Sequence, residues 1–414
     1  MRSRRAGPGG AGARVLAAVA ATSLAVGTPL RAQDARALAR MADSLIPYVE
    51  GASGLTFLHR LRLGLRTRAE VRDYVGREFK RFYPPERIAA ISVSYHLLGL
   101  LPDTAGFEHL LVDLYGEQLR GYCDPATDSL FGVSGTPPAA LREVLIHEMV
   151  HAVQAQYVDL RAFQASTADN DRRSAAQSLI EGQAMFTTMR LLVPRRNIVA
   201  EPNLWGFVTD HIRSQPAAQS AFRRAPLWLR EGMLAPYIYG AQFASWWNAS
   251  ALADTLPYGP RLPLSTEQIL HFPRYAAGDR PLTVRFAADS GPSVVADNVV
   301  GELEIQILAA QLSQTRALGQ LRPLGWGGDR YRVYASAAGP ALVWYLVWDD
   351  RESASSFESG TGARLAARRR PGYQSRLDTL SLGDHPAMRY VFAPADWEGW
   401  TELPEAVVAS AEGG

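Results

Sequence analysis

The sequence predicts an α+β protein that is rich in helix and ends in a small α/β module. Apolar residues recur every three or four positions through most of the chain, which is the spacing of amphipathic helices. Strand-like alternation becomes frequent only near the C-terminus, in residues 330–334, 341–348 and 388–392. About 380 residues are too many for one compact core, so we expect two regions, 34–315 and 316–414.

Residues 1–33 have the pattern of an export signal. Arginines precede an apolar run from Val15 to Val26, and the small residue Ala32 stands at a plausible cleavage position. That run is too short to span a bilayer, and no later segment is apolar for long enough. We therefore expect an exported protein, periplasmic or secreted, that begins near Gln33 and has no stable membrane span.

The charge of the chain argues against a nucleic-acid partner. Residues 1–33 contain five arginines and no acid, so their removal changes the formal net charge from +2 to −3. The one dense basic run, Arg368–Arg370, is interpreted as a solvated loop. Because Cys123 is the only cysteine, no intramolecular disulfide can form and the fold must be held by its core.

The N-terminal half begins with scaffold helices and a hairpin. Residues 34–48 form one amphipathic pattern, and a second pattern ends before Pro84. Residues 119–133 predict two short strands around a turn at 124–127. An exposed edge strand of such a hairpin can pair with an extended peptide, although a purely structural hairpin has the same pattern.

A helix over residues 139–160 carries His147-Glu148-x-x-His151. Thr136 is expected to cap it, and the prolines that follow suit its first turn. Residues four apart on a helix lie on one face, so both imidazoles point to one place, with Glu148 beside them. Buried among apolar residues, these groups need a partner, and a metal ion supplies one. The alternative is a pair of hydrogen-bonded histidines that hold no ion.

Two Glu-Gly pairs compete for the place of a third ligand. Glu181 lies on the apolar face of a predicted helix over residues 174–192, and Gly182 would let that helix pack directly against the first. Glu231, followed by Gly232, is the second candidate. We prefer Glu181 because it lies closer in sequence to His151. The alternative for Glu181 is a glutamate on the helix surface in a salt bridge.

The segment that follows Glu231 and the C-terminal region contribute further candidates. Tyr237 and Tyr239 could reach into the site, and Tyr239 is our candidate catalytic tyrosine, although both suit a core. Residues 265–270 indicate a capped short helix, and His271 after it is expected to be structural. Residues 301–312 predict a helix, and the five C-terminal tryptophans are expected to pack in the core.

The segments HEMVHA (147–152) and LIEGQA (179–184) resemble zinc metallopeptidases of the gluzincin type, in which a glutamate on a following helix completes the site. The chain looks most like a group of largely uncharacterised exported bacterial proteins. These share patterns similar to residues 121–125, 236–240 and 265–271, so the resemblance covers roughly residues 85–350. Met185 departs from thermolysin-like enzymes, which have an Asp there to orient a histidine.

This resemblance implies a zincin-like region with a mixed sheet and metal-binding helices. It further implies Zn²⁺ held by His147, His151 and Glu181, and hydrolysis of a peptide or protein substrate. Glu148 would act as the general base on a water at the zinc. The alternative is a catalytically inactive binding or structural protein with a zincin fold, in which Cys123 would be an adventitious ligand.

Overall fold

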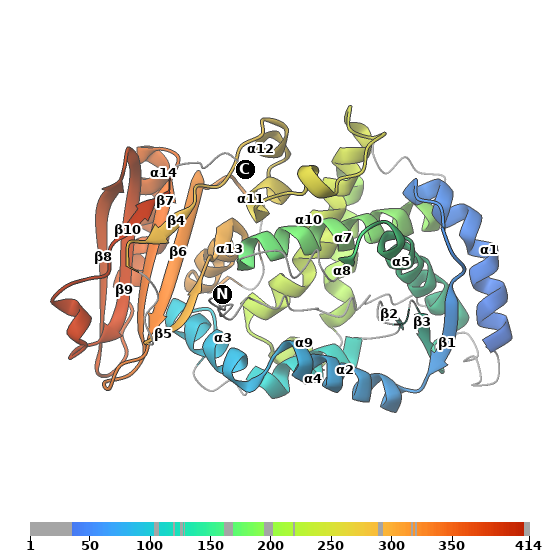
Figure 1. Ribbon diagram of the computed structural model, residues 1–414, viewed down its shortest axis with the longest axis horizontal. Coiled ribbons are helices and arrows are strands. Elements are labelled where there is room, and N and C mark those ends of the chain that lie inside the picture. Colours follow the sequence, from blue (N-terminus) through green and yellow to red (C-terminus); the bar gives the residue numbers. More distant parts are fainter. Residues whose placement is uncertain are drawn as a thin grey trace, which may run out of the picture.

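A helical part and a sheet-rich part make up the protein, in agreement with the predicted α+β class (Figure 1). The computed structural model describes residues 35–102, 107–118, 121–124, 127, 129–160, 169–193, 202–217, 220–288, 293–315, 318 and 321–409. The predicted export signal, residues 1–33, lies outside these ranges. None of the helices in the described ranges is long and apolar enough to cross a membrane.

The helical part occupies most of the chain between residues 35 and 312. Its α-helices are α1 (Ala35–Ser53), α2 (Arg68–Phe82), α3 (Pro85–Leu98), α4 (Phe107–Gln118), α5 (Pro138–Tyr157), α7 (Asn170–Leu192), α8 (Pro202–Ala217), α9 (Ser220–Arg224), α10 (Leu227–Ala249), α11 (Thr266–Leu270), α12 (Phe272–Ala276) and α13 (Gly301–Leu312). A 3₁₀ turn, η1 (Gly259–Arg261), precedes α11.

The helix that carries the His-Glu-x-x-His motif, α5, packs against a small mixed sheet. This sheet has the order β1-β3-β2, with β1 (Arg62–Arg66) parallel and β2 (Gly121–Asp124) antiparallel to β3 (Ser129–Val133). The predicted hairpin is thus confirmed, and β2 is an edge strand. Gly121 lets β2 approach α5 closely, since an added Cβ would lie 2.5 Å from the Val144 side chain.

Helices α7 and α10 touch through their backbones. A Cβ built on Gly182 of α7 would lie 2.6 Å from Cα of Gly240 and closer still to its carbonyl group. A Cβ on Gly240 of α10 would lie 2.8 Å from the carbonyl carbon of Ser178. The close approach expected at Gly182 therefore exists, but its partner is α10. The prediction that Gly182 packs against α5 is wrong.

The sheet-rich part is built on five antiparallel strands in the order β5-β6-β7-β9-β8. In the central strand β7, residues 342, 344, 346 and 348 pack into the core shared with the helices, and alternate residues pack into a second core. Both faces are therefore covered, which explains why β7 is apolar throughout. The strands are β5 (Val294–Asn298), β6 (Trp326–Tyr334), β7 (Ala341–Trp348), β8 (Tyr373–Leu382) and β9 (His385–Pro394).

Short elements complete both faces of this sheet. A two-stranded sheet of β4 (Val284–Phe286) and β10 (Ala406–Val408) contributes to the second core. Helix α13 and the α14 segment contribute to the first. The α14 segment consists of α14 (Arg351–Phe357), η2 (Glu358–Gly362) and α15 (Ala363–Ala366); η3 (Glu398–Trp400) follows β9.

Several boundaries differ from the prediction. Thr136 does not cap α5: the N-cap is Pro137, no side chain bonds to the helix start, and Pro138 takes the first helical position. Helix α7 begins at Asn170, ahead of the predicted 174, because the Asp169 side chain accepts from the N–H of Arg172. Strand β8 was not predicted, and 388–392 is not the last strand, because β10 follows it.

Candidate metal centre

Three side chains from α5 and α7 meet at one point inside the helical part. The Nε2 atoms of His147 and His151 lie 3.0 Å apart. Each lies 3.3 Å from Oε2 of Glu181. Among the described residues, these three form a group whose potential ligand atoms lie within 4.8 Å of one another. The structure therefore brings together the three residues predicted as metal ligands.

The triangle of ligand atoms has the size that a zinc ion requires. Zinc bonds to nitrogen and oxygen are about 2.0–2.2 Å, so two ligands of a tetrahedral ion lie about 3.3–3.5 Å apart. The observed separations of 3.0, 3.3 and 3.3 Å are close to these values. Two imidazoles and one carboxylate are also the ligand types of catalytic zinc sites. The residues present thus fit a zinc ion.

The electrostatics of the three groups favour a positive charge between them. Burial raises the pKa of Glu181, but the two histidines lower it more strongly, to about 2. Burial lowers the pKa of His147 to about 4, whereas Glu181 outweighs burial at His151 and raises its pKa to about 9. A proton on His151 or a metal ion would neutralise the Glu181 carboxylate.

Glu148 lies on α5 between the two histidines and is held by the edge strand. Its Oε2 accepts a hydrogen bond of 2.9 Å from the backbone N–H of Cys123 in β2. Its Oε1 has no hydrogen-bond partner among the described residues, and the side chain is fully buried. Burial raises the pKa of Glu148 to about 8. One oxygen is thus anchored while the other is free to exchange a proton.

The competing glutamate is engaged elsewhere. Glu231 is buried on α10, where its Oε1 lies 2.6 Å from Nη1 of Arg213. Tyr239 interacts electrostatically with both Arg213 and Glu231, and burial raises its pKa to about 12. Tyr237, in contrast, has its ring centroid 6.0 Å from that of His147. A catalytic role for Tyr239 stays a prediction, and Tyr237 is the tyrosine of this helix with a ring contact to a predicted ligand.

One functional candidate was missed in the sequence. Gln154 is fully buried and its Oε1 lies 2.9 Å from Nδ1 of His151. The signal was present, because a residue three positions after His151 shares its face of the helix. Position 185, where an orienting residue was sought, holds a methionine that packs at the edge of the hydrophobic core.

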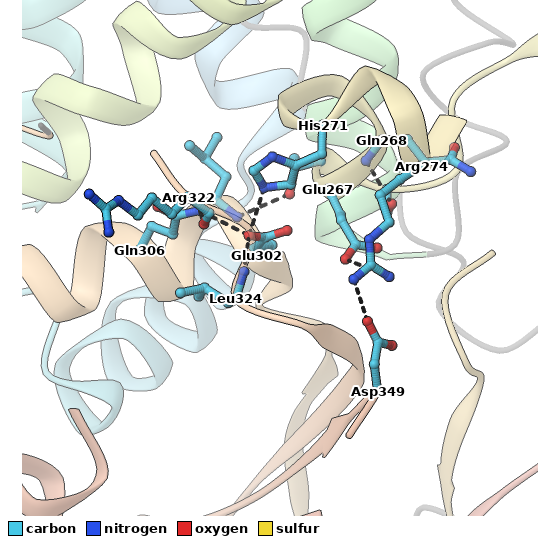
Figure 2. Close-up of polar contacts among 12 residues, drawn as sticks. Glu267, Gln268, His271, Arg274, Glu302, Gln306, Arg322, Leu324 and Asp349 are labelled. Carbon is cyan, nitrogen blue, oxygen red and sulfur yellow. Dashed lines mark hydrogen bonds and ion pairs between the residues drawn. The ribbon is translucent and has the colours of Figure 1, made fainter. Parts of the chain in front are cut away.

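His271 belongs to a separate polar cluster that joins the two parts of the protein (Figure 2). Its Nε2 lies 2.9 Å from Oε1 of Glu302 on α13, and that oxygen also accepts from Gln306. Beside it, Arg274 of α12 forms ion pairs with Glu267 and with Asp349, which follows β7. His271 thus links the end of α11 to α13, which agrees with the structural role expected of it.

Among known protein families, a match is found for the sheet-rich part of the chain. A family described as "Domain of unknown function (DUF8575)" matches residues 292–393, from the approach to β5 through most of β9. No curated protein and no solved structure proved similar to the chain. The matched segment and the five-stranded sheet both begin ahead of residue 316, the predicted boundary.

Proposed function

We propose that this protein is a zinc metallopeptidase of the gluzincin type that cleaves a peptide or protein substrate. The observation that carries the proposal is the meeting of His147, His151 and Glu181 beside the free Oε1 of Glu148. Structural zinc sites almost always have four protein ligands, whereas catalytic sites have three and keep one position open. Three ligands among the described residues favour the catalytic kind.

The protein groups have distinct tasks in this reaction. Zinc, when bound, would act as a Lewis acid that polarises the scissile carbonyl and makes water more acidic. Glu148 would accept the proton of the attacking water on Oε1 and pass it to the leaving amine. The Cys123 N–H would keep the other oxygen in place, so that the carboxylate needs no reorientation during transfer.

Strand β2 is the element best placed to position a substrate. It pairs with β3 along one edge, and the backbone of Cys123 on this strand reaches Glu148. An extended peptide that paired with this edge strand would present its backbone to the site by main-chain hydrogen bonds. We propose that the substrate binds in this way.

Burial favours a second candidate, a metal-binding protein without catalytic activity. The exposed fractions of His147, Glu148, His151 and Glu181 are 0, 0, 4 and 3%. A peptidase must expose its metal to a peptide bond, so the substrate could enter only after a movement of the neighbouring elements. A purely structural metal site needs no such movement.

An assay of the cleavage of a broad peptide library by the wild-type protein and by Glu148→Gln distinguishes a metallopeptidase from a metal-binding protein without activity. Glutamine has the same shape and can still accept from Cys123, but it cannot take up the proton. We expect the variant to keep its zinc and to lose hydrolysis by at least about a hundredfold. A wild-type protein that binds zinc but cleaves no peptide would support the second candidate, and equal turnover in both would refute the role of Glu148.

A further inference from the structure

Helix α5 carries a buried amide whose orientation is determined by its surroundings. Nε2 of Gln154 lies 3.2 Å from the backbone oxygen of Ile180 and 3.0 Å from Oε1 of Gln183. A carbonyl oxygen can only accept, so the amide nitrogen must face it. The reverse orientation would place two oxygens against each other. Oε1 of Gln154 is therefore the atom that faces His151.

This orientation determines the tautomer of His151. Because Oε1 of Gln154 can only accept, the Nδ1 atom of His151, 2.9 Å away, must carry the hydrogen. In the neutral imidazole the lone pair then belongs to Nε2, the atom that faces His147 and Glu181. Nε2 is thus ready to bind a cation. The other tautomer would direct an N–H at the ion.

A tyrosine holds the arrangement from a third segment. The hydroxyl of Tyr258, between α10 and α11, donates to Oε1 of Gln183 at 2.5 Å. The Gln183 oxygen thus accepts from both Gln154 and Tyr258, and these two hydrogen bonds add to the contact with Ile180 in opposing rotation of the Gln154 amide. Since Ile180 and Gln183 flank Glu181 on α7, the same amide also ties α5 to the turn that supplies the third ligand.

His147 has no equivalent support. Its Nδ1 has no hydrogen-bond partner among the described residues. The two imidazoles therefore differ: a buried side chain determines the tautomer of His151, and among the described residues none does so for His147.

We propose that Gln154 is the positioning residue of the metal centre: with Gln183 and Tyr258, it keeps His151 in the tautomer that binds metal and sets its distance from Glu181. This rests on the proposed zinc site. Metal-ligating histidines commonly need a partner on their second nitrogen; Met185 offers none, whereas Gln154 supplies one to His151.

The test is the zinc dissociation constant, measured by competition with a chelator on the full chain. Gln154→Met keeps the size of the side chain and removes its polar atoms, and we expect it to weaken zinc binding by about 10–100-fold. Gln306→Met is the matched control. Gln306 is also a buried helix glutamine that donates to a backbone oxygen, of Arg322 at 3.1 Å, and to a side chain. We expect this control to bind zinc like the wild type.

Gln154→Glu distinguishes positioning from mere packing. A carboxylate accepts from His151 Nδ1 but cannot donate to Ile180 or Gln183. We therefore expect the Gln154→Glu variant to unfold more readily than the wild type and yet to bind zinc more tightly than Gln154→Met. Zinc affinities that follow folding stability across the variants would overturn the proposal, as would wild-type affinity in Gln154→Met. A wild-type protein that takes up no zinc would overturn the metal site and this role together. Because zinc affinity is the readout, an absence of peptide cleavage would count against the proposed function alone.

Discussion

Replacing Gly182 with alanine should separate α7 from α10 and disturb the metal centre. The added Cβ would lie 2.6 Å from Cα of Gly240 and closer still to its carbonyl group, whereas ordinary contact begins at 3.4 Å, so the helices must move apart by at least about 0.8 Å. Overpacking of this kind costs up to about 3 kcal/mol. The better helix propensity of alanine offsets about 1 kcal/mol, which leaves a net loss of about 2 kcal/mol in the free energy of unfolding.

The same movement should weaken zinc binding, because Glu181 adjoins Gly182. Metal sites require ligand distances within about 0.2 Å of their ideal values. A helix movement of at least about 0.8 Å exceeds this tolerance, so we expect at least about a tenfold loss of zinc affinity.

Gly232→Ala on α10 is the matched control for this prediction. Nothing lies within 4 Å of a Cβ at Gly232, so this variant should be as stable as wild type or more stable by up to about 1 kcal/mol. Denaturant unfolding and chelator competition measure the two quantities. If Gly182→Ala is as stable as Gly232→Ala and binds zinc equally well, α7 and α10 are not in close backbone contact at Gly182.

Two further predictions concern single glutamates. Glu181→Gln should lose zinc affinity by some orders of magnitude, while Glu231→Gln should keep stoichiometric zinc because its carboxylate pairs with Arg213; the reverse result in metal analysis would make Glu231 the ligand. Glu304→Gln should change how stability depends on pH. Glu304 lies on α13, where its carboxylate accepts hydrogen bonds from Tyr95 and Trp228. Burial raises the pKa of Glu304 from 4.5 to about 7, so the folded state binds this proton more tightly than the unfolded state. The stability that this proton contributes is complete below pH 4.5 and is lost as pH rises through about 7, by about 3 kcal/mol in all. Glutamine cannot ionise, so the variant should match wild type near pH 4.5 and exceed it above pH 7; a difference that does not change with pH in denaturant unfolding would contradict this.

The grouping of the proposed metal ligands was predictable largely because local geometry brings the two histidines together. His147 and His151 are one helical turn apart, so their convergence needs only the helix. Glu181 required a second argument, a glutamate on a buried helix face, and the structure groups it with the histidines. Gln154 follows the same helical spacing and could have been recognised as a partner of His151.

Other features depend on contacts between distant parts of the chain. The partner of Gly182 is Gly240, and no local pattern links the two positions. Tyr237 and Tyr239 lie about 200° apart around α10, so the tyrosine that faces His147 depends on how the helix is rotated. Strand β8 was missed because it is an edge strand, and its exposed residues, such as Arg376, obscure the apolar pattern of a buried strand.

Metal analysis of the purified protein, alongside His147→Ala and His151→Ala, tests the central claim most directly. Three ligands hold a zinc ion that two cannot, so we expect about one zinc per chain in wild type and its loss in both variants. A wild-type protein without zinc, or stoichiometric zinc in either variant, would contradict the assignment of this site.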